Sequence, residues 1–118
     1  MSPTLVLNDS GKPTLSCGVA GGPKIITTVL QILVRTLDLG QTIDSAIAAE
    51  RVHHQWSPNQ AVCENALPEN IVKALRDRGH SVTRIRSGAV AQGVALKADG
   101  VLTAASDPRV PSSALGIE

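Results

Sequence analysis

Residues 16–26 read Ser-Cys-Gly-Val-Ala-Gly-Gly-Pro-Lys-Ile-Ile and join a strand-like run to the first apolar positions of a long helix. Glycine tolerates a positive φ and a close backbone approach, so Gly18, Gly21 and Gly22 predict a tight turn between the two elements. Pro23 has no N–H to donate, and its fixed φ suits the first turn of a helix. The stretch therefore predicts free backbone N–H groups at a helix start, where negative charge is stabilised.

The residues alone leave two interpretations of this glycine loop open. Glycine turns are common connections, so a strand-to-helix joint without a ligand is the simpler interpretation. The alternative is functional, because backbone N–H groups on a rigid turn stabilise an anion or a developing oxyanion.

The sequence on both sides of the loop predicts a layered α+β fold. Residues 4–8 and 13–17 alternate around a turn, which indicates a β-hairpin. Residues 24–39 are apolar around nearly the whole helix, which predicts a buried helix packed on a sheet. A second helix is expected over residues 43–50, with Thr42 as its cap.

The second half of the chain adds shorter elements. Strands are expected over residues 61–64, 81–86, 90–96 and 101–105, with a third helix from Pro68 to Gly79. Hairpins and sequential helices favour an antiparallel-rich sheet with helices on one face over a doubly wound parallel sheet. At 118 residues, the whole chain (1–118) is expected to form a single domain.

Composition excludes several functional classes. Hydrophobic residues make up 42% and charged residues 18%, as in globular domains. A formal net charge of +1 and a single aromatic side chain, Trp56, leave neither a basic patch nor a stacking surface for nucleic acid. We expect no signal peptide in this chain and no membrane segment, because no apolar run reaches spanning length.

The sequence offers no metal or cofactor site. Cys17 and Cys63 do not form a CxxC pair, and we expect two reduced thiols, although one disulfide between them remains open. His53 and His54 are adjacent and point to opposite sides of an extended chain, so they do not share a metal. A histidine packed beside Trp56 is the expected arrangement.

Two groups of charged residues are expected to be structural. Asp107 and Arg109 flank Pro108 and are predicted to pair as a clamp at a strand end. A loose arginine cluster is expected to be a solvated face; its members are Arg76, Arg78, Arg84 and Arg86.

Several motifs in order resemble a known family. They are residues 1–4 (Met-Ser-Pro-Thr), 21–31 (Gly-Gly-Pro-Lys-Ile-Ile-Thr-Thr-Val-Leu-Gln), 51–56 (Arg-Val-His-His-Gln-Trp), 79–80 (Gly-His) and 106–109 (Ser-Asp-Pro-Arg). Their order and spacing resemble the C-terminal part of the γ-glutamyltranspeptidase small subunit over nearly the full length. The resemblance implies part of the αββα sandwich of N-terminal-nucleophile hydrolases. It also implies transfer or hydrolysis of γ-glutamyl groups, such as that of glutathione.

By this resemblance, Gly21 and Gly22 fall on the two glycines whose N–H groups form the family's oxyanion hole. After the second glycine the family usually has a small polar residue, where this chain has Pro23. The family's nucleophilic threonine, its residues for the substrate α-amino group and its carboxylate-binding serine pair fall upstream of the residue that matches Met1.

Thr4, Thr27 and Thr28 are not expected to replace the nucleophile, because none is N-terminal with a free amine as base. The expected partner is therefore a large subunit or an upstream small-subunit chain. Whether this chain is an enzyme stays open: alternatives are an inactive structural domain that forms a homo-oligomer, or a small-anion binding module. Family members are often periplasmic, secreted or membrane-anchored.

Overall fold

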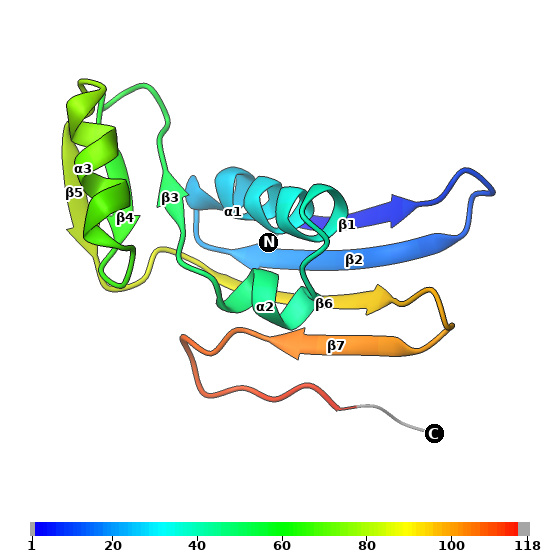
Figure 1. Cartoon of the computed structure of the whole chain (residues 1–118). Coiled ribbons are helices and arrows are strands. Elements are labelled where there is room, and N and C mark those ends of the chain that lie inside the picture. The colour runs from blue at the N-terminus through cyan, green and yellow to red at the C-terminus, as the bar shows by residue number, and fades with distance from the viewer. Residues whose placement is uncertain (1, 116–118) are drawn as a thin grey trace.

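The structure, a computed structural model, describes residues 2–115 and consists of two β-sheets with three α-helices (Figure 1). In chain order the elements are β1 (Ser2–Leu7), β2 (Pro13–Ala20), α1 (Lys24–Leu33), the π-helical segment η1 (Val34–Asp38), α2 (Ile43–Ala48), β3 (Val52–His53), β4 (Ala61–Glu64), α3 (Glu69–Asp77), β5 (Val82–Ile85), β6 (Val90–Leu96) and β7 (Leu102–Ser106). The predicted α+β class is confirmed.

The larger sheet, sheet A, has the strand order β1-β2-β6-β7, and all of its neighbours are antiparallel. Helices α1 and α2 lie on one of its faces (Figure 1), as the sequence predicts. We call this covered side the inner face and the opposite side the outer face. The smaller sheet B has the order β3-β4-β5, in which β4 and β5 are parallel and α3 connects them.

The hydrophobic core lies between the inner face and the two helices. Side chains at alternate strand positions point inward; they include Leu15, Cys17, Val19, Ala91 and Ala105, all buried. Ile32 of α1 and Ile43 and Ile47 of α2 fill the space above them. A Cβ on Gly93 would lie 3.0 Å from the Cδ1 of Ile43, so glycine at this position lets α2 approach the sheet closely.

The first helix differs from the prediction in two ways. Its α-helical part ends at Leu33, and the remainder, Val34–Asp38, has wider π-helical turns. The predicted packing on a sheet is confirmed, but the helix is only partly buried, because Ile26 is 77% exposed and Leu30 is 57% exposed. Periodicity shows that a side chain is apolar, but only one side of this helix meets sheet A.

Element boundaries also shift. Strand β2 continues through Gly18 to Ala20, so the turn is shorter than its glycines suggest. Helix α2 ends at Ala48, two residues before the predicted end, and Thr42 occupies the cap position without a side-chain cap hydrogen bond.

The segment after α2 contains a correction. The expected packing of Trp56 beside a histidine is wrong: Trp56 is 83% exposed and has a left-handed φ of 70°. His53 is buried in the short strand β3, where it meets α1 instead.

The remaining structural predictions concern cysteines, metals, membranes and arginines. Cys17 and Cys63 are free and buried, and burial raises the pKa of both thiols. Within residues 2–115, no cluster of His, Cys, Asp or Glu has the arrangement of a metal site, and no helix is long and apolar enough to cross a membrane.

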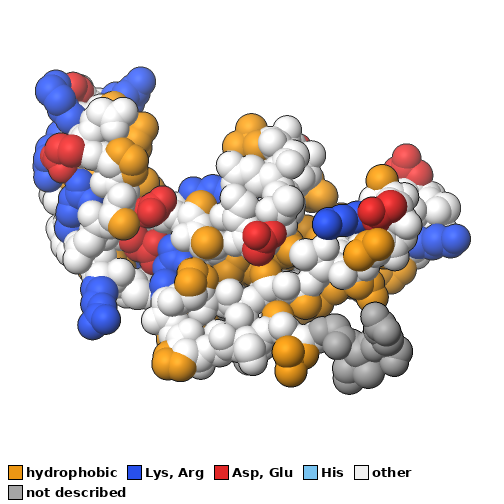
Figure 2. All heavy atoms as spheres, turned by 60° about the horizontal axis from the view of Figure 1, so that its bottom comes forward, with side chains coloured by type: hydrophobic (Ala, Val, Ile, Leu, Met, Phe, Trp, Pro, Cys, Tyr) orange, Lys and Arg blue, Asp and Glu red, His pale blue; other side chains and the backbone are white. Residues whose placement is uncertain are grey.

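Lys and Arg side chains gather at the α3 end of the molecule (Figure 2), where Arg76 and Arg84 both pair with Glu69.

Candidate functional site

The glycine loop connects β2 to α1, and each of its two glycines has a separate structural reason. A Cβ on Gly21 would lie 2.6 Å from the Cβ of Ala89, closer than real side chains come, so only glycine fits there. Gly22 has a φ of +57°, a conformation that other residues rarely adopt. The predicted tight turn is therefore fixed by one close approach and one left-handed residue.

The hydrogen bonds of the loop leave two donors free. The N–H groups of Lys24 and Ile25 donate to the carbonyls of Gly21 (3.2 Å) and Gly22 (3.1 Å), so the first helical donors are already used. The N–H groups of Gly21 and Gly22 themselves meet no acceptor within residues 2–115. Pro23 adopts a right-handed helical φ of −62° at the helix cap, so proline fits this turn.

Contacts one turn into α1 tie the loop to the 51–56 segment. The hydroxyl of Thr27 lies 2.8 Å from Nδ1 of His53. The side-chain amide of Gln31 donates to the carbonyl of Val52 at 2.7 Å and accepts from its N–H at 3.0 Å. Gln31, near the end of α1, thus bonds β3 as a neighbouring strand would, so Thr27 and Gln31 together hold α1 against β3.

A small cavity of about 120 Å³ lies beside the loop. Its lining includes Pro23, Lys24, His53, Gln55 and Gln60. Lys24 forms no ion pair with a carboxylate among the described residues, so this side of the loop is positively charged.

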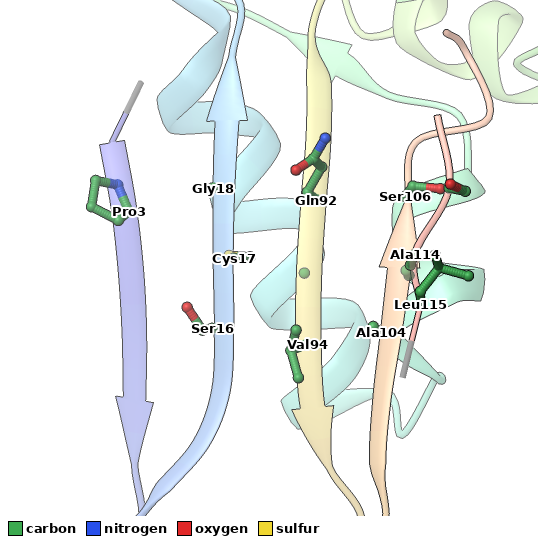
Figure 3. Close-up of a pocket in the computed structure, with 13 residues that line it drawn as sticks. Pro3, Ser16, Cys17, Gly18, Gln92, Val94, Ala104, Ser106, Ala114 and Leu115 are labelled. Carbon is green, nitrogen blue, oxygen red and sulfur yellow. The ribbon is translucent and has the colours of Figure 1, made fainter. Parts of the chain in front are cut away.

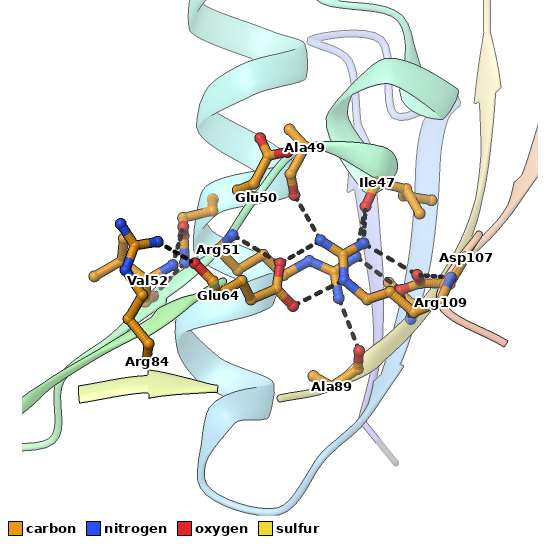
Figure 4. Close-up of polar contacts among 12 residues, drawn as sticks. Ile47, Ala49, Glu50, Arg51, Val52, Glu64, Arg84, Ala89, Asp107 and Arg109 are labelled. Atoms are coloured by element: carbon orange, nitrogen blue, oxygen red, sulfur yellow. Dashed lines mark hydrogen bonds and ion pairs between the residues drawn. The ribbon is translucent and has the colours of Figure 1, made fainter. Parts of the chain in front are cut away.

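A buried ionic network lies behind the loop (Figure 4). Nη2 of Arg51 is 2.8 Å from Oδ2 of Asp107, and these side chains are 5% and 0% exposed. Arg109 bonds to Asp107 at 3.1 Å and also to Glu64. The predicted Asp107–Arg109 clamp is confirmed, and the structure adds two partners that lie far away in the sequence.

The charge states follow from these contacts. Burial alone would raise the pKa of Asp107, but the N–H of Ala91 and the guanidinium groups of Arg51 and Arg109 hold this pKa below its usual range. Glu64 and Asp107 raise the pKa of Arg109 against the opposing effect of burial. Both shifts favour the charged forms of Asp107 and Arg109.

Among residues 2–115, helices α1 and α2 lie on the inner face of sheet A (Figure 1), and Figure 3 shows residues that line a cavity on the opposite, outer face. It carries a cavity of about 310 Å³, whose lining includes Ser16, Gln92 and Ser106 together with Ala114 and Leu115 of the tail. Large apolar side chains on this face are exposed; they are Leu5 (58%), Val94 (38%), Leu96 (39%) and Leu102 (69%).

Sequence reasoning identified Gly21 and Gly22 but missed the residues that support them. Ala89 and Arg51 lie behind the loop, at positions 68 and 30 residues further along the chain. Arg51, the first residue of the Arg-Val-His-His motif, could have been recognised from the sequence. An arginine beside a strand is costly to bury unless its charge has partners, so it pointed to such partners. No local pattern marked Ala89.

Comparisons with known proteins identify the family of this chain. The gamma-glutamyltranspeptidase family model matches residues 1–117. The chain is 40% identical over 109 residues to the glutathione hydrolase proenzyme of Escherichia coli, covering 92% of this chain but 19% of that protein.

Solved structures give the same result. A gamma-glutamyltranspeptidase from Pseudomonas nitroreducens, complexed with L-DON, matches with a TM-score of 0.90 at 28% identity, covering 100% of this chain and 62% of that chain. The T380A mutant of the Helicobacter pylori enzyme matches with a TM-score of 0.85 at 32% identity, covering 93% of this chain and 61% of that one.

The described α+β fold thus matches part of the N-terminal-nucleophile hydrolase structures of this family, and the chain spans about one fifth of the full-length enzymes. Members of the family transfer or hydrolyse γ-glutamyl groups. On the match over residues 1–117, this chain belongs to the gamma-glutamyltranspeptidase family.

Proposed function

We propose that this chain is the C-terminal part of a γ-glutamyltranspeptidase small subunit and supplies the oxyanion hole of the active site. The observation that carries this proposal is the pair of free N–H donors at Gly21 and Gly22, held on a loop with little freedom. Hydrolysis or transfer of a γ-glutamyl group passes through a tetrahedral intermediate whose oxygen carries negative charge. Rigid backbone donors stabilise that charge without reorganising, and losing one such donor typically costs about 10²–10³ in kcat.

The nucleophile in this proposal comes from polypeptide outside these residues. A hydroxyl inside the chain is a poor substitute: that of Thr27 is bonded to His53 and to the carbonyl of Lys24, and Thr28 is only 2% exposed. Activation of a threonine needs a base beside it, such as its own free amine at an N-terminus. Thr4 lies within β1, so its own nitrogen belongs to a peptide bond and is not a free amine.

The outer face of sheet A supports the proposal that a second sheet packs on it, giving an αββα sandwich. Leu5, Val94 and Leu102 are exposed on this face, whereas a face that remains in water is ordinarily polar. A second sheet from the upstream polypeptide would bury these side chains. It would also bring the nucleophile of that polypeptide to the end of sheet A where the glycine loop follows β2. The partner in this proposal is thus an upstream small-subunit or large-subunit chain.

Complementation tests the proposal. The E. coli glutathione hydrolase truncated before the segment that this chain matches is mixed with the chain, and release of 4-nitroaniline from γ-glutamyl-4-nitroanilide is followed. We expect release from the mixture and none from either component alone. A stoichiometric complex that releases no 4-nitroaniline would overturn the proposal.

The exposed apolar face also supports an alternative, a catalytically inactive domain that pairs with a second copy of itself through this face. Light scattering separates the two, since the alternative requires a dimer or larger assembly of the isolated chain.

A small-anion binding module is a third candidate, supported by the free N–H groups of Gly21 and Gly22. Calorimetry with glutamate and with sulfate tests it, and the absence of heat would remove it.

A further inference from the structure

Ala89 is the residue against which the glycine loop rests. It is 5% exposed and comes just before β6, and its Cβ and Cα occupy the space where Gly21 would carry a side chain. The distances from an ideal Cβ on Gly21 are 2.6 Å to Cβ and 2.9 Å to Cα of Ala89. Any movement of Ala89 toward or away from the loop therefore shifts the backbone of Gly21 or leaves it unsupported.

Two charged side chains hold the backbone of this segment. Nη1 of Arg51 donates to the carbonyl of Ala89 at 3.0 Å, and the N–H of Ala91 donates to Oδ2 of Asp107 at 2.8 Å. Arg51 and Asp107 are bonded to each other, and Arg51 also donates to the carbonyl of Ile47 at 2.6 Å. The position of residues 89–91 is thus set by a buried ion pair as well as by strand pairing.

We propose that Arg51 and Asp107 are positioning residues for the Gly21 and Gly22 N–H donors, acting through Ala89. The catalytic consequence rests on the function proposed above, whereas the structural coupling does not. The reason for such a device is geometric. Oxyanion donors act at about 2.7–3.1 Å from the oxygen, and a site must be held within about 0.5 Å to stay effective. Gly21 rests against Ala89, so the ion pair that holds residues 89–91 also supports the loop.

A purely stabilising role would look different from a positioning role. If the ion pair only stabilised the fold, its loss would lower the midpoint of unfolding and leave the native loop unchanged. A positioning role requires a local change at Gly21 and Gly22 in the folded protein. The backbone amide resonances of the two glycines report this difference directly.

The test compares three variants of the chain by ¹H–¹⁵N NMR. Ala89→Gly removes the methyl group facing Gly21 without changing any charge, and Arg51→Lys keeps the charge but replaces the two guanidinium nitrogens that bond Ala89, Ile47 and Asp107 by a single ammonium nitrogen. Ile43→Val, in the core near Gly93, is the matched control that lowers stability away from the loop. We expect the amides of Gly21 and Gly22 to shift or broaden in the first two variants and to stay unchanged in the control. Those of Gly40, Gly79 and Gly100 serve as internal references.

The inference is overturned if the Gly21 and Gly22 amides are unchanged in Ala89→Gly, or if they move as much in Ile43→Val. Because Ala89→Gly removes only one methyl group, it tests the contact between Ala89 and Gly21 even if Arg51→Lys does not fold; Asp107→Asn then takes the place of Arg51→Lys as the test of the ion pair.

The complemented enzyme gives the second readout. We expect Ala89→Gly to lower kcat at least about tenfold with KM within about twofold, because misplaced donors weaken only the transition state. If the wild-type mixture is inactive, the proposed function fails while the amide shifts still decide the coupling. If the wild-type mixture is active and Ala89→Gly matches it in kcat, the positioning role fails and the proposed function stands.

Discussion

The two faces of sheet A come from the same four strands, yet they differ in what covers them. On the inner face, Val19 and Ala91 are fully buried in the core cluster that also contains Ile32 of α1 and Ile47 of α2. On the outer face, Leu5 and Leu102 are more than half exposed although they are as apolar as the core. Alternation along a strand makes one face apolar and the other polar when only one is buried. The apolar side chains on the outer face therefore support our proposal that a second sheet packs on it.

The largest expected effect comes from the ionic network beside the inner face. Asp107→Ala removes the carboxylate from Arg51 and leaves a buried charge without its partner, so we expect the free energy of unfolding to fall by about 3–5 kcal/mol. Asp77→Ala breaks the exposed Lys73–Asp77 pair, whose side chains are 71% and 58% exposed, and is expected to cost at most about 1 kcal/mol. Urea unfolding monitored by circular dichroism measures both. Equal losses in the two variants would contradict the structural role of the network.

A matched pair of truncations compares the two faces directly. Ile47→Ala on the covered side is expected to lower the free energy of unfolding by about 2–5 kcal/mol, because it leaves a cavity in the core. Leu102→Ala on the outer face is expected to change it by less than about 0.5 kcal/mol in the isolated chain. If Leu102→Ala lowers the free energy of unfolding as much as Ile47→Ala does, the outer face is already packed in the isolated chain, and the difference between the two faces is contradicted.

Acid should act through the inner network. The folded pKa of Asp107 lies below its ordinary value, so its ionisation contributes stability at neutral pH. That contribution is complete above the unfolded pKa of about 3.9 and is lost as the pH falls through the lower folded value. We expect the wild-type chain to lose stability steeply below about pH 4, and Asp107→Asn to lose less over the same interval. Urea midpoints at pH 7, 4 and 3 measure this, and parallel curves would contradict it.

The smallest effect on stability is expected from charges placed on the outer face. Leu5→Lys combined with Leu102→Lys should leave the free energy of unfolding within about 1 kcal/mol of wild type, because both positions are already exposed. The same double variant should lose its association with the truncated E. coli polypeptide used for complementation, because a lysine covered by that polypeptide would be a buried charge. Size-exclusion chromatography of the mixture measures association, and an unchanged complex would show that the partner binds elsewhere.

Features that depend on contacts between residues close in sequence could be predicted, whereas features that depend on contacts between distant residues could not. The hairpin of β1 and β2 and the start of α1 follow from local signals such as the turn before Lys12 and the Gly-Gly-Pro loop. The Asp107–Arg109 pair was predictable because only one residue separates its members. The residues alone left an oxyanion site at the glycine loop as one of two interpretations, the family resemblance assigned it to Gly21 and Gly22, and this role is still a prediction.

What the sequence could not give depends on tertiary contacts. Arg51 and Asp107 are 56 residues apart, and nothing local shows that they meet. The exposure of Ile26 was mispredicted because periodicity records apolar character and not the presence of a partner. The exposed Trp56 was mispredicted for a similar reason: its left-handed φ of 70° turns the segment in a way that its neighbours in sequence do not indicate.

In the function that we propose, the outer face and the glycine loop together complete a γ-glutamyl-transferring site with a second polypeptide. The most direct measurement is the rate of 4-nitroaniline release from γ-glutamyl-4-nitroanilide by the complemented mixture, for the wild-type chain and for the Leu5→Lys/Leu102→Lys variant. The account predicts release with the wild-type chain and its loss with the double variant, although both chains fold alike. Equal rates for the two chains, or no release from a wild-type complex that has formed, would contradict it.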